Sequence, residues 1–442
     1  MRMTAWGNYP KIESEVIHLR SVQQAQKEIE TNDSIISMGM ARSYGDSALS
    51  QNIIITRRFN YILDFDGEQG IVTCESGVTL KDLLNTFVPK GWFLPVTPGT
   101  KYITVGGAIA SDVHGKNHHR EGTFCDHLLL LELLLPSGDI IICSPTINSK
   151  IFRATCGGNG LTGIILRATF QMKRIETAYI RQRTIKAKNL GQMVELLEMN
   201  ENYTYTVAWI DCMAKRNSLG RGVLFLGEHA EKVDLASEKL NGNPYIIKDH
   251  KKLNVPIFFP NFVLNKMSIE SFNSLYYFKF PKDVHDCIVD YDTFFYPLDS
   301  IYNWNRIYGK RGFTQYQLVI PKSSGIKGVQ RIIKRVSDKK MGSFLAVLKI
   351  FGKANGNLLS FPREGYTLTL DFPINRSLFS FLNDLDDVVL EYGGRLYLTK
   401  DVRMSARMFR MGYPNWKKFV AIRQDIEADN KFHTLQSRRL GI

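Results

Sequence analysis

The sequence lacks the cysteine spacing of a zinc site or a disulfide framework. Its six cysteines are scattered over 442 residues, and no two of them form a CxxC pair: Cys74, Cys125, Cys143, Cys156, Cys212 and Cys287. Structural zinc sites and small disulfide-rich domains need closely spaced cysteines. We therefore expect reduced, mostly buried thiols and no metal site. Histidines at positions 114, 118, 119 and 127 leave this expectation unchanged, because no nearby cysteine completes a ligand set.

Long apolar runs are also missing. The most apolar stretch, 128–135, is interrupted by Glu132 and is far shorter than the roughly 20 residues of a spanning helix. The first 16 residues contain no apolar core of a secretory signal. We expect a cytoplasmic protein with neither a signal peptide nor a transmembrane helix, at most bound peripherally to the inner face of the membrane.

Acidic residues are in deficit. The chain has 43 Asp and Glu against 57 Lys and Arg, so its formal net charge is +14. Such a charge favours anionic partners, among them phosphorylated ligands, acidic lipids and nucleic acids. Neither a zinc-finger spacing nor an RNP-type aromatic motif is present, so nucleic acid is not an expected partner. Disorder is excluded as the main state, because 26 Phe, 19 Tyr and 5 Trp supply too much apolar surface to leave in water.

The pattern of predicted secondary structure changes near residue 178. The first part is predicted to be rich in short strands, at 34–38, 52–56, 61–65, 70–74, 128–135 and 140–143, with helices at 79–87 and 148–155. Longer helices are predicted afterwards at 189–199, 228–241 and 328–337, and two more follow residue 401, split near 412–414. The segment 255–280 is dense in irregularly spaced aromatics, which favours a loop or cap over a core helix, although a hydrophobic core segment remains an alternative.

Four short segments are candidates for binding and chemistry. They are 39–46, 98–115, 157–165 and 397–401, and the first three are rich in glycine and other small residues. Small residues let backbone N–H groups approach phosphate oxygens. Gly158, Gly160 and Gly163 mimic the GxGxxG fingerprint, but a strand rather than a helix is predicted after them. The Rossmann interpretation therefore fails its structural test.

In this order, the segments resemble those of the FAD-linked oxidases of the vanillyl-alcohol oxidase/PCMH type. Within that family, the resemblance is to members that oxidise a polyprenylphosphoryl ribose. The matching stretches are Trp6-Gly7, 42–46, 114–119, 157–165, 304–306, 315–317, Phe351-Gly352, 371–374 and 393–401. The resemblance spans nearly the whole chain and is weakest at 180–290.

The resemblance implies an α+β fold in three parts. A PCMH-type, two-part FAD-binding domain is expected at 1–178 and a substrate-binding or cap domain with an antiparallel sheet and helices at 179–395. A C-terminal segment, 396–442, is expected to return to the FAD domain. The expected FAD-binding residues are Ser37, Met38, Gly39, Met40, Ala41, Arg42, Ser43, Tyr44, Gly45, Asp46, Ser47, Gly99, Thr104, Val105, Gly106, Gly107, Ser111, Asp112, Val113, His114, Ile165 and Tyr397.

Three positions depart from the family pattern. Arg42 stands where relatives with covalent flavin carry a histidine, so we expect non-covalent FAD. Ala41 replaces a glycine, a change small enough for the backbone contact to survive. Thr369 stands where some members carry a cysteine facing the flavin, so thiol chemistry is not required in this chain.

Oxidising a sugar hydroxyl requires a base for the hydroxyl proton and delivery of a hydride to flavin N5. The expected catalytic residues are His114, Lys400, Gln315, Gln317, Lys349 and Tyr44, with Lys116 as pocket lining. Either His114 or Lys400 is the candidate base; the ordinary alternatives are a histidine bound to loop backbone and a solvated lysine.

The roles of three strand residues depend on which way their side chains point. Lys349 interrupts an apolar strand, so it points either outward or inward to the sugar or phosphate. Gln315 and Gln317 share one face of a predicted strand. They suit hydroxyl recognition there, with an exposed polar face as the alternative.

The resemblance implies FAD-dependent oxidation of a secondary sugar hydroxyl, namely C2 of a polyprenyl-phosphate-linked pentose such as ribose. The keto sugar would be the first half of a 2′-epimerisation that an NAD(P)H-dependent short-chain reductase completes. The alternatives are a soluble alditol or aldonolactone oxidase, and a binding protein that has lost FAD. The sequence leaves the electron acceptor and the oligomeric state open.

Overall fold

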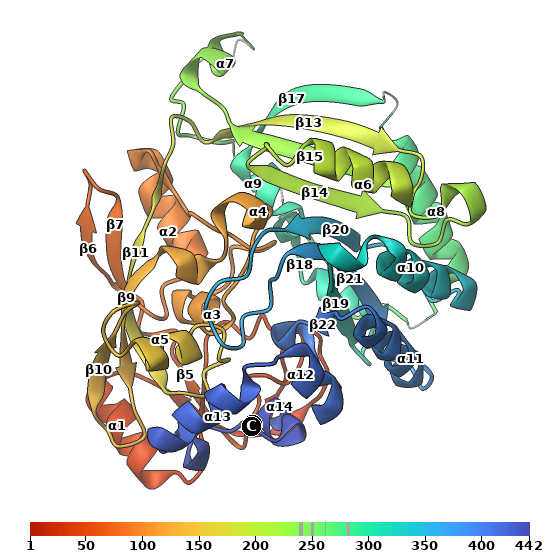
Figure 1. Cartoon of the computed structure of the whole chain (residues 1–442). Helices are drawn as coiled ribbons and strands as arrows, with labels where there is room; N and C mark the ends of the chain where they lie inside the picture. Colours follow the sequence, from red (N-terminus) through yellow and green to blue (C-terminus); the bar gives the residue numbers. More distant parts are fainter. Residues whose placement is uncertain (238–241, 249–251, 261, 281–282) are drawn as a thin grey trace.

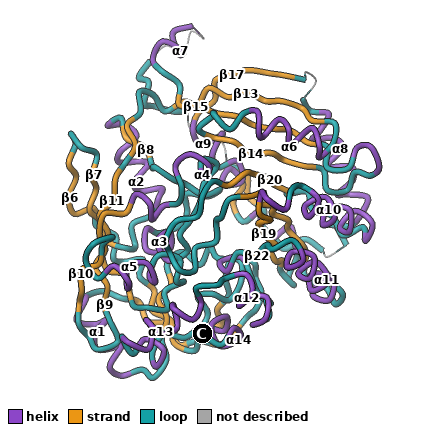
Figure 2. Tube along the Cα trace, viewed as in Figure 1, coloured by secondary structure: helices purple, strands orange, loops and turns teal. Residues whose placement is uncertain are grey.

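A computed structural model describes residues 1–237, 242–248, 252–260, 262–280 and 283–442. Its described residues form an α+β fold with three larger sheets (Figure 1). Figure 2 shows that loops fill much of the region between the N-terminal sheets and the largest sheet. Three two-stranded pairs complete the strands: β1 (Arg2–Met3) with β2 (Ile12–Glu13), β8 (Trp92–Phe93) with β12 (Lys173–Arg174), and β16 (Leu253–Asn254) with β18 (Ile301–Tyr302).

The N-terminal part contains two sheets. A parallel sheet has the order β3 (Glu15–His18), β5 (Asn52–Ile55), β4 (Ile36–Met38). An antiparallel sheet has the order β10 (Ile140–Cys143), β9 (Leu128–Leu134), β11 (Ile164–Gln171), β7 (Ile71–Glu75), β6 (Ile62–Asp66). The helices of this part are α1 (Val22–Thr31), α2 (Leu80–Phe87), α3 (Val105–Ala110), α4 (His118–Glu121) and α5 (Ser149–Thr155). These positions confirm the strands and both helices predicted before residue 178.

Helix α2 illustrates how the sequence sets these elements. Thr79 and Asp82 form a reciprocal capping box, which satisfies backbone N–H groups at the start of the helix. Leu80, Leu83, Leu84 and Phe87 are buried along one side, as their helical spacing predicts. The cap fixes where the helix begins, and the apolar side attaches it to the core of the N-terminal part.

The largest sheet is antiparallel and has eight strands. Their order is β17 (Val284–Asp290), β13 (Tyr179–Ala187), β15 (Gly222–His229), β14 (Tyr205–Ile210), β20 (Ala346–Phe351), β21 (Gly365–Pro373), β19 (Phe313–Pro321), β22 (Arg395–Leu396). Alternate side chains point to opposite faces of a strand. Residues such as Ala208, Leu348 and Leu368 therefore pack into a hydrophobic core with helices α6 (Leu190–Met199), α10 (Lys327–Lys339) and α11 (Leu378–Glu391). On each strand, the side chains at the positions that alternate with these core residues point to the opposite face of the sheet.

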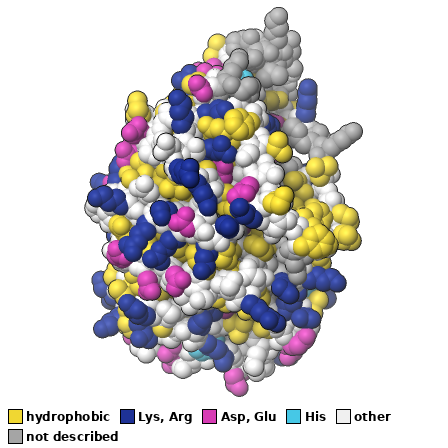
Figure 3. Space-filling view, turned by 90° about the vertical axis from the view of Figure 1, so that its right-hand side faces the viewer, with side chains coloured by type: hydrophobic (Ala, Val, Ile, Leu, Met, Phe, Trp, Pro, Cys, Tyr) yellow, Lys and Arg dark blue, Asp and Glu magenta, His cyan; other side chains and the backbone are white. Residues whose placement is uncertain are grey.

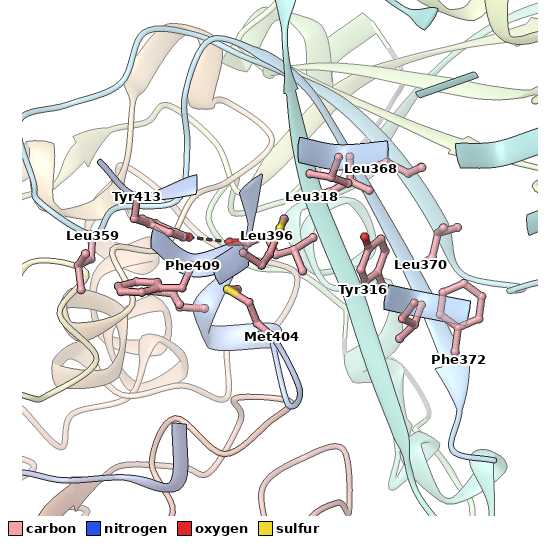
Figure 4. Packing of buried hydrophobic residues seen from close by; sticks show 14 of the residues in the cluster. Tyr316, Leu318, Leu359, Leu368, Leu370, Phe372, Leu396, Met404, Phe409 and Tyr413 are labelled. Carbon is pink, nitrogen blue, oxygen red and sulfur yellow. Dashed lines mark hydrogen bonds between the residues drawn. The ribbon is translucent and has the colours of Figure 1, made fainter. Parts of the chain in front are cut away.

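The C-terminal segment packs back onto the N-terminal part. Helix α13 (Trp416–Asp425) lies beside α5, whereas α12 (Ala406–Gly412) and α14 (Leu435–Leu440) lie beside each other (Figure 1). Phe432 forms a parallel bridge with Ile35, and the buried guanidinium of Arg423 donates to the carbonyl of Leu161 at 2.9 Å. Figure 4 shows that the Tyr413 hydroxyl donates to the carbonyl of Leu396, beside buried residues of β19 and β21.

Two predicted elements were wrong in detail. The helix predicted at 228–241 overlaps the end of β15, and helix α7 covers only Lys232–Ser237; residues 238–241 lie outside the described part. Within 255–280, where we predicted a loop or cap, helix α8 runs from Lys266 to Phe278, and Asn261 lies outside the description. Helix α9 (Tyr291–Phe295) follows β17. The division of the chain at 178 and 395 remains a prediction.

The cysteines form no disulfides, as their scattered spacing predicts. All six cysteines are free, and only Cys287 is partly exposed, so the predicted buried thiols are confirmed. Among the described residues, no helix combines the length and the apolarity needed to cross a bilayer.

Candidate active site

One cavity of about 640 Å³ joins the loops of the N-terminal part to the free face of the eight-stranded sheet. Arg42, Gly106 and Gly163, from three separate segments, all line it. The three glycine-rich segments 39–46, 98–115 and 157–165 therefore meet at one cavity. The sheet contributes Gln182, Val207, Trp209, Phe225, Gln315, Gln317, Val347, Lys349 and Thr369.

The loop after β4 presents a row of free backbone donors. Within the described part of the chain, none of the N–H groups of residues 39–43 donates to a protein acceptor. Ala41 adopts a left-handed conformation with φ of 51°, and successive N–H groups around such a residue form an anion-binding concavity. The loop lines the cavity, so its geometry fits a phosphate or pyrophosphate group.

Helix α3 packs closely against this loop. The Thr104 hydroxyl caps α3 by accepting from the N–H of Gly107 at 3.1 Å. A Cβ at Gly39 would overlap the Thr104 hydroxyl, so only glycine permits this approach. Ser76 also lines the cavity, and its buried hydroxyl has no partner among the described residues. A bound polar group in the cavity would supply that partner.

Arg42 lies at the cavity between two aromatic rings. Its guanidinium carbon is 3.9 Å from the ring centroid of Trp6 and 5.5 Å from that of Tyr102. Burial lowers the pKa of Arg42, and Asp299 opposes this shift. An arginine side chain offers no nucleophile for a flavin bond, so the position fits a cofactor held without covalent attachment.

His114 is buried at the cavity wall among aromatic rings. Its ring centroid is 4.7 Å from that of Phe351 and 5.3 Å from that of Tyr397. The Nε2 of His114 is 3.0 Å from Nε2 of Gln317, while Nδ1 is buried without a partner in the described structure. Burial lowers the pKa of His114 well below its ordinary value, and Lys349 adds to the effect. The imidazole is therefore neutral near pH 7.

Lys400 lies over the ring of Tyr44, with its Nζ 3.8 Å from the ring centroid. Burial lowers the pKa of Lys400 to about 7, although the carboxylate of Asp371 opposes this shift. Asp371 is fully buried and accepts from Nε2 of Gln315 at 2.6 Å and from the Tyr308 hydroxyl at 3.2 Å. Burial also raises the pKa of Asp371 to about 7, so Lys400 and Asp371 both titrate in the neutral range.

The sheet decides the direction of Lys349. Leu348 and Ile350 point into the helix-covered core, so Lys349 points into the cavity. Of the two directions left open by the sequence, the inward one is observed. Lys116, on the loop before α4, also lines the cavity and donates from Nζ to the carbonyl of Phe294. Burial lowers the pKa of Lys349 to about 8 and that of Lys116 to about 7.

Most of the residues predicted for binding or catalysis line this cavity. They are Ser37, Met38, Gly39, Met40, Ala41, Arg42, Ser43, Tyr44, Ser47, Gly99, Thr104, Gly106, Gly107, Ser111, Val113, His114, Ile165, Gln315, Gln317, Lys349, Tyr397 and Lys400.

Four predicted residues are not among those that line it. Asp46 pairs with Arg439, and a Cβ at Gly45 would overlap the carbonyl oxygen of Asp401. Val105 packs in the core of the N-terminal part. Asp112 accepts from the side-chain amides of two residues after β20, Asn355 and Asn357, at 2.9 Å each. These four residues hold the wall of the cavity together.

Sequence reasoning missed the apolar end of the cavity and the carboxylate of Asp371. The apolar end consists of Val207, Trp209, Phe225, Leu345 and Val347, with Tyr276 and Phe280. Alternation of Val207 and Trp209 with the core residues Ala208 and Ile210 was the available signal. Asp371 gave no local signal, because its partners Gln315 and Tyr308 lie outside its own strand.

The remaining histidines of the 114–127 cluster have ordinary partners. Nδ1 of His118 accepts from the N–H of Gly352 at 3.2 Å. Nε2 of His119 contacts the carbonyl of Tyr203, and that of His127 contacts the carbonyl of Glu121.

Comparison with known proteins identifies relatives along the whole chain. Residues 14–144 match a model of an FAD binding domain. The chain is 37% identical to decaprenylphosphoryl-β-D-ribose oxidase of Mycolicibacterium smegmatis, with 100% of this chain and 97% of the relative aligned. It is 30% identical to an uncharacterised protein of Streptomyces coelicolor over 83% of this chain and 100% of the relative. It is 21% identical to L-gulono-1,4-lactone dehydrogenase of Mycobacterium tuberculosis over 91% of this chain and 89% of the relative.

Proposed function

The chain belongs to the family of FAD-dependent oxidoreductases that includes decaprenylphosphoryl-β-D-ribose oxidase, and on that premise we propose that it oxidises the C2 hydroxyl of a polyprenyl-phosphate-linked ribose to a ketone. The observation that carries the proposal is the composition of this cavity. Free backbone donors lie in one of its regions, Lys400 and His114 in another, and an aromatic, apolar surface in a third. A dinucleotide, a sugar and a prenyl chain require these three environments.

Lys400 is the base in this proposal. When bound, FAD supplies the acceptor for the hydride that leaves C2. The neutral amine of Lys400 takes the proton of the C2 hydroxyl, so that the oxygen becomes the carbonyl oxygen of the product. A base works best when its pKa is near the working pH, and the pKa of Lys400 is lowered to about 7 by burial. Asp371 lies close enough to stabilise the resulting ammonium.

His114 serves as a hydrogen-bond donor to the substrate. Gln317 donates from Nε2 to Nε2 of His114, which leaves the imidazole proton on Nδ1. That buried Nδ1 has no partner within the described residues, so a substrate oxygen would satisfy it. With its pKa held well below the ordinary value, His114 is a weak base and is better suited to orienting the sugar.

Gln315 on β19 and Asp371 on the neighbouring β21 also orient the sugar. Because Nε2 of Gln315 is bound to Asp371, the carboxamide oxygen of Gln315 is free to accept from a substrate hydroxyl. Asp371 itself does not line the cavity, so it acts through Gln315 and Lys400 as a positioning residue.

The prenyl chain is proposed to leave along the apolar end of the cavity, past α8. Tyr276 and Phe280 line the cavity, whereas Met267, Phe272, Leu275 and Phe278 of α8 are exposed by 44–75%. Figure 3, which views the side of the molecule on which α8 lies, shows hydrophobic side chains gathered among Lys and Arg residues. An exposed apolar helix face with flanking lysines suits the surface of an anionic membrane.

Replacing both Leu275 and Phe278 with Asp is expected to weaken binding to vesicles of anionic phospholipid by about tenfold or more, because two exposed apolar side chains that would enter the membrane are removed and two negative charges that repel the lipid are added. Cosedimentation with vesicles measures the effect. Ile142→Asp, at an exposed apolar residue of β10, is the control and should bind as the unmodified protein does. Equal binding by all three proteins would remove α8 from the membrane contact.

The keto sugar product is proposed to pass to an NAD(P)H-dependent reductase, which would complete epimerisation at C2. The alternative substrates, soluble alditols and aldonolactones, have no apolar tail. The aromatic end of the cavity, with Trp209 and Phe225, therefore favours the prenylated substrate over them.

Anaerobic flavin bleaching tests this function. The purified protein is expected to be yellow, to release FAD on denaturation and to bleach when mixed with farnesylphosphoryl-β-D-ribose. Xylitol and L-gulono-1,4-lactone at the same concentration should leave the flavin oxidised. Bleaching by the soluble sugars alone would replace the proposal with its alternative, and a colourless protein would contradict both.

A further inference from the structure

Lys116 and Lys349 line the cavity, and among the described residues neither side chain forms an ion pair with a carboxylate. Nζ of Lys116 donates to the carbonyl of Phe294 and lies 4.3 Å from the centroid of that ring. Nζ of Lys349 makes no hydrogen bond or ion pair in the described part of the chain, and its recorded ring contact is Phe351, at 5.7 Å. The Lys116 carbonyl accepts from the N–H of Thr206 on β14, the strand next to β20, so Lys116 lies beside the strand that carries Lys349. An unpaired charge in such a position is costly.

The groups around the two lysines do not neutralise them. Lys349 faces His114, His118 and Lys400 as well as Lys116, and all of these are bases. The nearby carboxylates belong to Asp371, which acts on Lys400, and Asp112, which acts on His118. Asp371 is bound by Gln315 and Tyr308, and Asp112 by asparagine amides. An anionic ligand in the cavity would supply the counter-charge that these side chains lack and would favour the charged form of both lysines.

Strand order places Lys349 between the two ends of the cavity. In the sheet, β20 lies between β14 and β15, which carry Val207, Trp209 and Phe225, and β21 and β19, which carry Thr369, Gln315 and Gln317. The register pairs Ala208 with Leu348 and Lys349 with Thr367. Thr367 is itself near Gln317, the partner of His114. The order across the sheet is apolar surface, lysine, then sugar-binding amides.

We propose that Lys116 and Lys349 form a subsite for the phosphodiester of a prenylphosphoryl sugar. The inference rests on the proposed function, since it assigns the middle of the same substrate. In that substrate the phosphodiester stands between the prenyl chain and the sugar, in the order that the sheet presents. A phosphodiester carries one negative charge and two free oxygens, so each ammonium can donate to it.

The subsite predicts how binding depends on pH. Burial lowers the pKa of Lys349 to about 8 and that of Lys116 to about 7, whereas a bound anion favours their charged forms. The phosphodiester stays ionised throughout this range. Its affinity should therefore be highest below pH 7 and fall as pH rises through 7 and 8, by at most about tenfold per pH unit for each proton taken up. Affinity for an uncharged glycoside should stay nearly constant.

Binding to the oxidised holoenzyme, without turnover, tests the subsite. The probes are farnesylphosphoryl-2-deoxyribose, which has no C2 hydroxyl to oxidise, and farnesyl 2-deoxyriboside, which lacks the phosphate. Dissociation constants are read from the change in flavin absorbance. Lys349→Gln and Lys116→Gln should each weaken binding of the phosphodiester by about 10- to 100-fold and that of the neutral glycoside by less than about threefold. Lys353→Gln, at an exposed lysine just beyond β20, is the matched control.

Lys349→Arg keeps the charge and should retain the preference for the phosphodiester. FAD content and thermal unfolding identify any variant that has lost its fold, in which case Lys349→Arg and the pH dependence of the unmodified protein decide. Equal weakening of both probes, or no weakening, would overturn the subsite. A preference for the phosphodiester in a protein that oxidises no prenylphosphoryl ribose would contradict the proposed function and leave the subsite standing.

Discussion

Lys400→Ala is expected to slow anaerobic flavin bleaching by about 10²- to 10⁴-fold, the range typical for loss of a positioned general base. Lys400 lies over Tyr44 in the cavity, and no carboxylate forms an ion pair with it within the described structure. FAD should stay bound, because the free N–H groups of residues 39–43 are untouched. Rapid mixing under anaerobic conditions measures the rate, and Lys353→Ala, at an exposed lysine, is the control.

The pH profile separates a base from a fixed cation. A base acts in its neutral form, so the bleaching rate should rise with pH through about 7, the lowered pKa of Lys400, and then level off. Asp371→Asn removes a carboxylate that raises this pKa, so the midpoint should move to lower pH. Lys400→Ala should show no rise near pH 7. A wild-type rate that falls as pH rises through 7 would mean that Lys400 acts as a cation and not as a base.

His114→Ala is expected to slow bleaching by about 10²- to 10³-fold while leaving the midpoint of the pH profile in place. The substitution removes the Nδ1 donor and the partner of Gln317, so the sugar is no longer oriented. The midpoint near pH 7 should persist, since the pKa of His114 is held well below that range by burial and Lys349. Stopped-flow bleaching from pH 6 to 9 gives both quantities.

The matched control for His114 is His119→Ala. His119 contacts the carbonyl of Tyr203 and does not line the cavity, so this variant should react at nearly the original rate. A midpoint that vanishes in His114→Ala but persists in Lys400→Ala would exchange the roles of the two residues. Unchanged bleaching in His114→Ala would remove it from the chemistry.

Short sequence patterns predicted much of the site, because glycine-rich loops and alternating strands can be recognised from a few neighbouring residues. Three glycine-rich segments were candidates for binding, and their residues Arg42, Gly106 and Gly163 all line the cavity. Alternation placed Gln315 and Gln317 on one face of β19, which is observed. The direction of Lys349 could not be predicted, because it depends on which face of β20 is covered by helices distant in sequence.

Two predicted residues that do not line the cavity make contacts that are distant in sequence. Asp46 follows the binding loop, yet its carboxylate pairs with Arg439 near the C-terminus. Asp112 ends the α3 segment, yet it binds Asn355 and Asn357 after β20. Nothing in the local sequence distinguishes such carboxylates from ligands of a cofactor.

The aromatic segment 255–280 was misjudged for a related reason. An amphipathic helix is recognised by one apolar face. Tyr276, on α8, and Phe280, just beyond it, line the cavity, whereas Leu275 and Phe278 are exposed. Because α8 has apolar residues on both sides, its sequence lacks the single apolar face by which an amphipathic helix is recognised. The segment was therefore predicted as a loop or cap.

Loss of a C2 deuterium tests the central claim most directly. Farnesylphosphoryl-β-D-ribose labelled with deuterium at C2 is mixed anaerobically with one equivalent of holoenzyme, and the sugar product is examined by mass spectrometry. The account predicts that the flavin bleaches more slowly than with unlabelled substrate and that the product is a 2-keto sugar without the deuterium. A bleached enzyme whose oxidised product still carries the C2 deuterium would contradict it.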